Sequence, residues 1–104
     1  MADIDRERVY TVEEIKQRLY PVFHANNIKK AILFGSYANN TAHKQSDVDI
    51  LVDSRMRGLR FCGLAYDMRN ALAKDADVYD IRYVDAHSPI FEIIRAGVTI
   101  YESE

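Results

Sequence analysis

The chain has 104 residues, 48 % hydrophobic and 29 % charged, a composition that suits one globular domain over residues 1–104 with a modest core. Its formal net charge of -2 argues against non-specific nucleic-acid binding, which normally needs an excess of basic residues. The single cysteine cannot form an internal disulfide, and the sequence shows neither a signal core nor an apolar run of membrane-spanning length. We therefore expect a cytoplasmic protein that does not associate with membranes.

The first predicted element is a helix from about Val12 to about Ala25. Thr11 and Glu14 have the spacing of a capping box, which satisfies two backbone amides at the start of a helix. Apolar residues then recur at three- and four-residue intervals. We expect Pro21 to kink or divide this helix and Asn26-Asn27 to end it.

Three segments have the composition of strands, and a helix is predicted between the second and the third. Ala31–Phe34 is a short apolar run that stops at Gly35, and Asp47–Asp53 is a second such run. From about Leu59 to about Ala73 the apolar residues have helical spacing. Asp77–Val84 is rich in β-branched and aromatic residues, which favour a third strand.

The end of the chain predicts one more helix and one more strand. Ser88-Pro89 has the pattern of a helix N-cap followed by proline at the first helical position, and Gly97 is typical of the residue that ends a helix. Val98–Tyr101 follows as a short strand. The order helix, strand, strand, helix, strand, helix, strand indicates an α/β (α+β) fold, with helices packed on a small sheet.

Two carboxylates interrupt the most apolar strand. Because side chains alternate along a strand, Asp47 and Asp49 point to the same side, with Cα atoms about 6.6 Å apart. Like charges this close repel each other, and burial increases the cost. A bound divalent cation removes both penalties, and Mg²⁺ prefers carboxylate oxygens together with substrate phosphates. The pair therefore predicts part of a magnesium site.

Gly35-Ser36 stands where the first strand must turn. Glycine lets the backbone approach a phosphate closely, and the following amides together with the Ser36 hydroxyl can bind an anion. The ending of a P-loop is absent. The alternative is structural: Asp47 would be a turn residue and Asp49 a solvated strand residue.

The combination of these motifs resembles the DNA polymerase β-type nucleotidyltransferase superfamily. The resemblance rests on Gly35-Ser36-x-Ala38 and on Ser46-Asp47-x-Asp49-Ile50-Leu51-Val52. It is closest to the minimal nucleotidyltransferases, which include MntA-like antitoxins encoded beside a HEPN-domain toxin, and the ending EIIRAGVTIYE is typical of them. The resemblance implies a polymerase β-like fold with a small mixed sheet.

The resemblance also implies a site and a reaction. Asp47, Asp49 and Asp77 would be the catalytic residues and would hold two Mg²⁺ ions, and Gly35 and Ser36 would bind the triphosphate of ATP. Asp80 is a rival for the third carboxylate, although alternation places it on the opposite face from Asp77. AMP would pass from ATP to a hydroxyl, in the antitoxin-like members a tyrosine of the HEPN toxin, and self-modification is a further possibility.

One departure from the family pattern leaves a second function open. Asn39 and Asn40 stand where the family usually has a basic residue followed by glycine. Asparagine tolerates left-handed backbone angles, so Asn40 is expected still to turn the chain, but the positive charge is missing. The alternative is a non-catalytic binding module that inhibits its partner by occlusion. Either function allows a homo- or hetero-oligomer.

Overall fold

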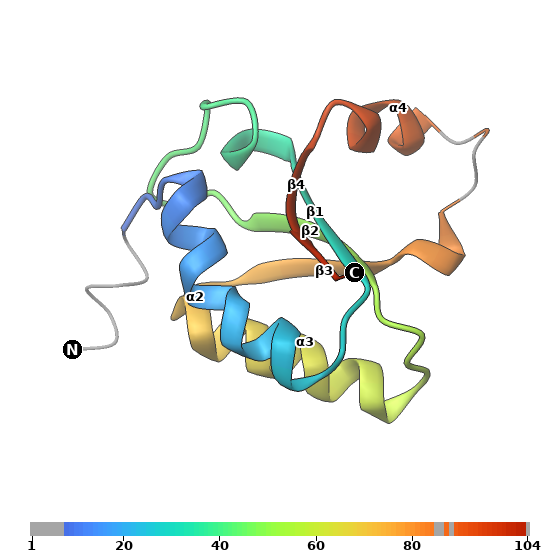
Figure 1. Ribbon diagram of the computed structural model, residues 1–104. Coiled ribbons are helices and arrows are strands. Elements are labelled where there is room, and N and C mark those ends of the chain that lie inside the picture. The colour runs from blue at the N-terminus through green and yellow to red at the C-terminus, as the bar shows by residue number, and fades with distance from the viewer. Residues whose placement is uncertain (1–7, 85–86, 88, 104) are drawn as a thin grey trace.

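The computed structural model, which describes residues 8–84, 87 and 89–103, shows a sheet with helices on both faces (Figure 1). The helices are α2 (Val12–Ala25), α3 (Leu59–Leu72) and α4 (Pro89–Arg95), and the strands are β1 (Lys30–Phe34), β2 (Val48–Asp53), β3 (Ala76–Asp80) and β4 (Val98–Glu102). Two short 3-10 turns, η1 (Gly35–Tyr37) and η2 (Ile81–Tyr83), follow β1 and β3. None of the described helices has the length and apolar character needed to cross a membrane.

The strands lie in the order β3-β2-β1-β4 and form a mixed sheet. β1 is antiparallel to both β2 and β4, whereas β2 and β3 are parallel. A parallel pair needs a crossover connection, and α3 supplies it. The predicted α/β class and the predicted order of elements are confirmed.

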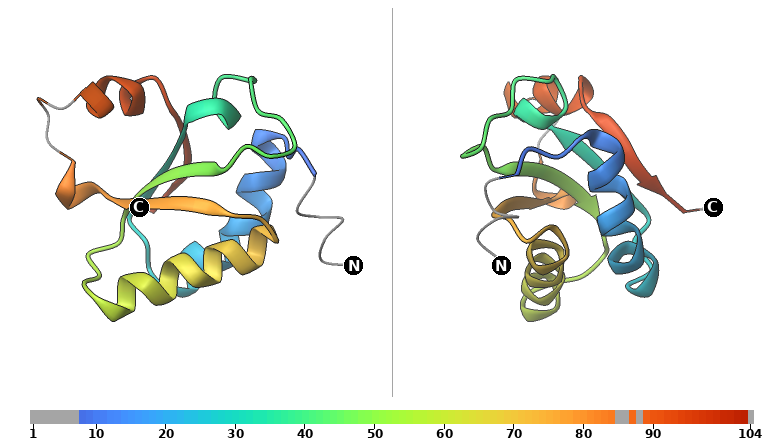
Figure 2. Two further views of the ribbon diagram at one scale, coloured as in Figure 1. Left: turned by 180° about the vertical axis from the view of Figure 1, so that it is seen from behind. Right: turned by 90° about the vertical axis from the view of Figure 1, so that its left-hand side faces the viewer.

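Each face of the sheet buries its own apolar cluster. Val48, Ile50 and Val52 alternate along β2 and are fully buried in the larger cluster, which includes residues of α2 and α3. Figure 2 shows these two helices together on one side of the sheet and α4 on the other. Leu51 faces that other side, in a smaller cluster with Ile94 of α4. Asp49 therefore shares its face with α4 and not with the main core.

The predicted first helix agrees with the structure at both ends. Thr11 and Glu14 form the complete capping box, and Asn26 caps the C-terminus. The expectation that Pro21 divides the helix is wrong, because α2 continues through it. Pro21 and Gln17, whose carbonyl the proline cannot bond, are both exposed, so water can solvate the freed carbonyl group.

The third strand is shorter than predicted. It ends at Asp80 instead of Val84, because the Asp80 carboxylate accepts a hydrogen bond from the Arg82 amide (3.0 Å) and begins η2. The helix predicted to reach Ala73 ends one residue earlier, since Ala73 is left-handed with φ 53°. The predicted N-cap at Ser88 lies outside the described residues.

Near the C-terminus, Pro89 is the first residue of α4, as predicted. The Gly97 amide donates to the Ile94 carbonyl at 2.9 Å, and a Cβ at Gly97 would lie 2.6 Å from the carbonyl oxygen of Leu33. Glycine therefore lets the chain leave α4 and approach β1 closely enough to begin β4.

Candidate functional site

The predicted carboxylates come together where β2 and β3 begin. In the parallel pairing of these strands, Asp49 lies directly opposite Asp77. On the other side of β2, Phe34 at the end of β1 is the partner of Asp49. Asp47 directly precedes β2 instead of belonging to it. The crossover through α3 thus places two acids from distant parts of the sequence side by side.

Asp49 carries the strongest sign of crowding between like charges. Its pKa is raised from the ordinary 3.8 to about 6, first by burial, then by the negative charges of Asp77 and Asp47, and also by a side-chain hydrogen bond with Asp77. Each of these effects disfavours the ionised form. The position therefore favours any cation that can neutralise it.

Gly35 brings the turn after β1 against Asp49. Its φ is +73°, in the left-handed region that favours glycine, and a Cβ there would collide with Oδ2 of Asp49 and lie 3.3 Å from its Cγ. The Gly35 carbonyl accepts from the amides of Ala38 (3.1 Å) and Asn39 (3.2 Å), which closes η1. Ser36 lies within η1, so the predicted small-residue turn and the carboxylates are neighbours.

Asparagines complete the turn in place of the family's basic residue and glycine. Asn40 adopts φ 64°, as its tolerance of left-handed angles predicts. The Asn39 carboxamide oxygen accepts hydrogen bonds from the amide and hydroxyl of Thr41, and the Thr41 amide donates to the Ser36 carbonyl at 2.9 Å. The backbone turn therefore survives the departure, but without an added positive charge.

A buried lysine holds the loop that leads into Asp47. Lys74 is 6 % exposed, and its ammonium donates to the carbonyl of Lys44 at 2.9 Å. His43 and Ser46 close the same loop, because the Ser46 amide donates to the His43 carbonyl and the His43 amide donates to the Ser46 hydroxyl, both at 2.9 Å. Asp47 is thus presented by a fixed loop.

Asp80 has different surroundings from Asp77. Asp80 is 7 % exposed. Its carboxylate accepts hydrogen bonds from Nε of Arg82 and from a terminal guanidinium nitrogen of Arg82, the latter at 2.7 Å. Hydrogen bonds from Arg82 lower the pKa of Asp80. Alternation sends it to the opposite face from Asp77. Asp80 is occupied by an ion pair, whereas Asp77 faces Asp49.

Two aromatic residues beside the carboxylates were not singled out from the sequence. The rings of Phe34 and Tyr79 contact each other, with centroids 5.5 Å apart. The pKa of the Tyr79 phenol is raised by burial and then by the negative charges of Asp77, Asp49 and Asp47. The position of Tyr79 was predictable from the sequence, because Asp77 and Tyr79 are two residues apart on one strand and therefore share a face.

The described residues contain no ready-made metal cluster. Within residues 8–84, 87 and 89–103, no three His, Cys, Asp or Glu side chains are gathered closely enough to hold a metal ion as they stand. Asp49 and Asp77 are the pair whose carboxylate oxygens fit a hard cation such as Mg²⁺, and the charge of Asp47 reaches both Asp49 and Tyr79. The donor chemistry at this end of the sheet therefore suits magnesium.

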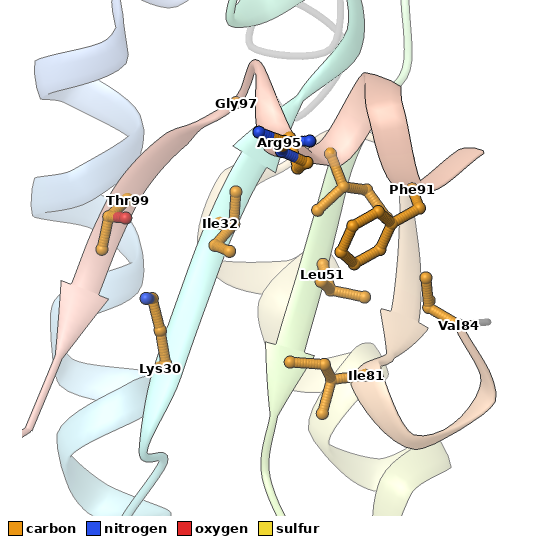
Figure 3. Close-up of a pocket in the computed structure, with 10 residues that line it drawn as sticks. Lys30, Ile32, Leu51, Ile81, Val84, Phe91, Arg95, Gly97 and Thr99 are labelled. Carbon is orange, nitrogen blue, oxygen red and sulfur yellow. The ribbon is translucent and has the colours of Figure 1, made fainter. Parts of the chain in front are cut away.

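A pocket of about 330 Å³ opens on the same side of the sheet, beneath α4 (Figure 3). Its walls include Ile32 and Leu51 from the sheet and Phe91 from α4, and Lys30 and Arg95 stand at its edge. Leu51 lies two residues beyond Asp49 on the same face. Phe34 and Tyr79 do not line the pocket, so the aromatic pair belongs to the surroundings of the carboxylates.

Comparison with known proteins identifies the family. The family described as polymerase beta, nucleotidyltransferase matches residues 13–104. The chain belongs to this family. Over 69 residues it is 36 % identical to MJ0435 of Methanocaldococcus jannaschii, a candidate protein adenylyltransferase, and the match covers 64 % of this chain and 74 % of that protein.

Solved structures share the same fold. A chain in the crystal structure of a toxin-antitoxin with AMP-PNP has a TM-score of 0.71 and 23 % identity, over 86 % of this chain and 74 % of that one. A chain in the complex of a tri-AMPylated Shewanella oneidensis HEPN toxin with an MNT antitoxin has a TM-score of 0.66 and 19 % identity, over 89 % and 74 %. The polymerase β-like nucleotidyltransferase fold implied by the sequence motifs is therefore confirmed.

Proposed function

We propose that the chain transfers AMP from ATP, in the presence of Mg²⁺, to a tyrosine hydroxyl of a HEPN-type toxin and so acts as its antitoxin. The observation that carries this proposal is the position of Asp49, which lies opposite Asp77 and against the turn at Gly35. The arrangement brings acidic groups beside a turn of small residues, as a triphosphate with its counter-ions requires.

Asp47, Asp49 and Asp77 would hold Mg²⁺, with two ions in the complete site. When bound there, Mg²⁺ would neutralise the carboxylates and polarise the phosphate oxygens. The raised pKa of Asp49 supports this assignment, because its causes among the described residues are burial and other acidic groups, with no positive group that would stabilise the ionised form. Gly35 and the Ser36 amide and hydroxyl would bind the outer phosphates.

The reaction needs little covalent participation by the protein. The acceptor oxygen attacks the α-phosphorus, the bond to the β-phosphate oxygen breaks, and pyrophosphate leaves with the electron pair. Asp77 would accept the proton of the acceptor hydroxyl. Gly35 and Ser36 would hold the departing pyrophosphate and stabilise its charge. Positioning would supply most of the rate enhancement.

The acceptor is assigned to a partner protein because of what similar proteins do and because the tyrosine within the motif is buried. MJ0435 is named for protein adenylyl transfer, and a structural neighbour is a complex that holds an AMPylated HEPN toxin. Tyr37, the tyrosine within the motif, is 3 % exposed, and burial raises the pKa of its phenol. Its hydroxyl is buried close to the Tyr10 backbone. Self-modification at Tyr37 would require the core to open.

The turn at Asn39-Asn40 favours one alternative. Without a basic residue there, nucleotide affinity could fall until the chain acts only as a binding module that covers its partner. Labelled ATP separates the two functions. The purified chain, Mg²⁺, [α-³²P]ATP and the HEPN-domain protein encoded beside it are incubated, and label on the HEPN protein is measured. We expect label on a tyrosine; tight binding without label would establish the alternative instead.

A further inference from the structure

The loop between β2 and α3 alternates buried and exposed side chains. Ser54 and Met56 are each 8 % exposed, whereas Arg55 and Arg57 between and after them are exposed. The two inward residues anchor the loop, so the two arginines must point outward. A loop of this kind differs from an ordinary solvated one, in which neither the backbone nor the side-chain directions are fixed.

Hydrogen bonds fix the loop further. The Met56 amide donates to the Ser54 hydroxyl at 3.0 Å, and the Arg82 guanidinium donates to the Met56 carbonyl. Asp80 in turn holds Arg82. Arg55 adopts φ 61°, a left-handed angle that is unfavourable for a residue other than glycine. The backbone is therefore held in a strained conformation that displays cationic groups.

Positive charge accumulates at this place although the chain is acidic overall. Arg60 adds a third exposed arginine, and in the described part of the chain none of Arg55, Arg57 and Arg60 forms an ion pair. The first turn of α3 contains no acidic residue. Like charges are gathered here without ion-pair partners of their own, so the surface is complementary to an acidic one.

An apolar groove of about 410 Å³ adjoins the arginines. Its walls include Met56, Phe61, Tyr79 and Tyr83, and it is also lined by Arg57 and by Arg82, whose charge is paired with Asp80. Tyr83 is 82 % exposed, and the neighbouring Leu59 is 90 % exposed. Large apolar side chains so fully exposed beside a groove are typical of interaction surfaces.

We propose that this arginine-rimmed groove docks an acidic segment of the partner polypeptide, with an apolar side chain of that segment in the groove. The inference rests on the proposed function, which supplies the partner. One wall of the groove is β3, the strand that carries Asp77, and Tyr79 reaches both the groove and the carboxylates. The β3 residues that line the groove, Val78 to Asp80, lie within about 10 Å of Asp77 along the strand. The groove would thus guide the acceptor hydroxyl toward the site.

The apolar groove favours a polypeptide over nucleic acid. A nucleic acid would need a continuous basic surface for its phosphates, whereas here the cationic rim surrounds apolar walls. A short acidic segment with an apolar anchor satisfies both the rim and the walls.

Charge reversal tests the proposal. The dissociation constant for the co-encoded HEPN-domain protein is measured for the wild type, Arg57→Glu and Leu59→Ser, with Lys16→Glu as the charge-matched control on α2. Lys16 lies outside the groove, and 41 % of its side chain is exposed. We expect Arg57→Glu and Leu59→Ser to weaken binding about tenfold or more, since both alter the proposed contact. Lys16→Glu should change it less than about twofold.

Stability and nucleotide binding keep the result interpretable. Because Leu59 is 90 % exposed, Leu59→Ser should leave the melting temperature unchanged, and both Arg57→Glu and Leu59→Ser should keep the wild-type affinity for Mg²⁺–ATP. Equal effects of Arg57→Glu and Lys16→Glu would overturn the docking surface, while label transfer by the wild type would still support the proposed function. Weaker binding by Arg57→Glu and Leu59→Ser without any label transfer by the wild type would support the docking surface and overturn the proposed function.

Binding of a fluorescent 20-nucleotide single-stranded RNA tests the alternative that this surface binds nucleic acid. The wild type should not bind it at 150 mM salt. RNA binding that Arg57→Glu removes, with unchanged affinity for the HEPN-domain protein, would overturn the proposal and assign the surface to nucleic acid.

Discussion

β3 carries two aspartates, three residues apart, in opposite electrostatic situations. Asp80 is buried, bonded to Arg82, and has a lowered pKa. Asp77 lies across from Asp49, whose pKa is raised to about 6. One strand thus holds an acid with its charge compensated and an acid facing another acid. The first arrangement stabilises the fold, whereas the second costs stability in the absence of a cation.

The difference separates structural from functional acids without any appeal to the family. A carboxylate whose pKa is raised by burial and by neighbouring acids lowers the stability of the fold when it ionises. Such groups are concentrated at ligand sites. Asp80, by contrast, holds Arg82 in place, and Arg82 in turn holds the loop between β2 and α3 at Met56. If this division is right, substitutions at the two places must have opposite effects on activity and stability.

The largest expected effect is on catalysis. Asp49→Asn should reduce AMP transfer by at least about 10³-fold, because it removes a charged oxygen ligand without changing side-chain volume. Asp80→Asn, measured well below its melting temperature, should transfer AMP within about threefold of the wild type. Initial rates with labelled ATP measure both. Equal losses in the two variants would erase the distinction between the acids.

The second effect is on stability. Asp80→Ala should lower the free energy of unfolding by about 1–2 kcal/mol, because it removes the hydrogen bonds that the buried carboxylate accepts from Arg82. Urea unfolding followed by circular dichroism measures the change. Arg82→Ala should also destabilise the fold, because it leaves the buried Asp80 carboxylate without its cation, and the double variant should cost less than the sum of the two. Additive effects would show that the two side chains do not depend on each other.

A third effect tests the contact between the turn and the carboxylate. Gly35→Ala should lower stability by about 1 kcal/mol, since alanine is disfavoured at φ +73°. Its Cβ would also displace the Asp49 carboxylate, so Mg²⁺–ATP binding should fall much more than stability does. Calorimetric titration of Mg²⁺–ATP at a temperature where the variant is folded checks this. Nucleotide affinity equal to that of the wild type would separate the turn from the site.

Much of the fold follows from short-range patterns in the sequence. The capping box at Thr11 and Glu14 and the period-two alternation of β2 predicted their elements closely. Alternation also predicted that Asp77 and Asp80 lie on opposite faces. The end of β3 was not predictable in this way, because it depends on a hydrogen bond between the Asp80 side chain and the Arg82 backbone.

The site was accessible from the sequence only in part. The motifs indicated which carboxylates to compare, and the structure places Asp49 against both Asp77 and the Gly35 turn. Their metal-binding and catalytic roles stay predictions. The spacing of Asp77 and Tyr79 predicts that they share a face, but the contact of Tyr79 with Phe34 and the fixed display of Arg57 depend on contacts between distant segments, which residue spacing does not encode.

The smallest expected effect is a gain in stability, whereas most substitutions lower the stability of a protein. Asp49 has a raised pKa when folded, so its contribution to stability is present below about pH 4 and is lost as the pH rises through about 6. An asparagine side chain at this position does not titrate. At pH 7.5 without Mg²⁺, Asp49→Asn should therefore be more stable than the wild type by about 1 kcal/mol, after allowance for solvent screening of this half-buried group.

Thermal unfolding measures this difference between wild type and Asp49→Asn, and it should appear as a rise of about 4–8 °C in melting temperature at pH 7.5 and vanish near pH 4. Millimolar Mg²⁺ should raise the melting temperature of the wild type and leave the variant unchanged, because only the wild type gains a neutralising ion. A variant that is less stable than the wild type at every pH would show that Asp49 is compensated within the fold, as Asp80 is. The contrast between the two ends of β3 would then have no electrostatic basis.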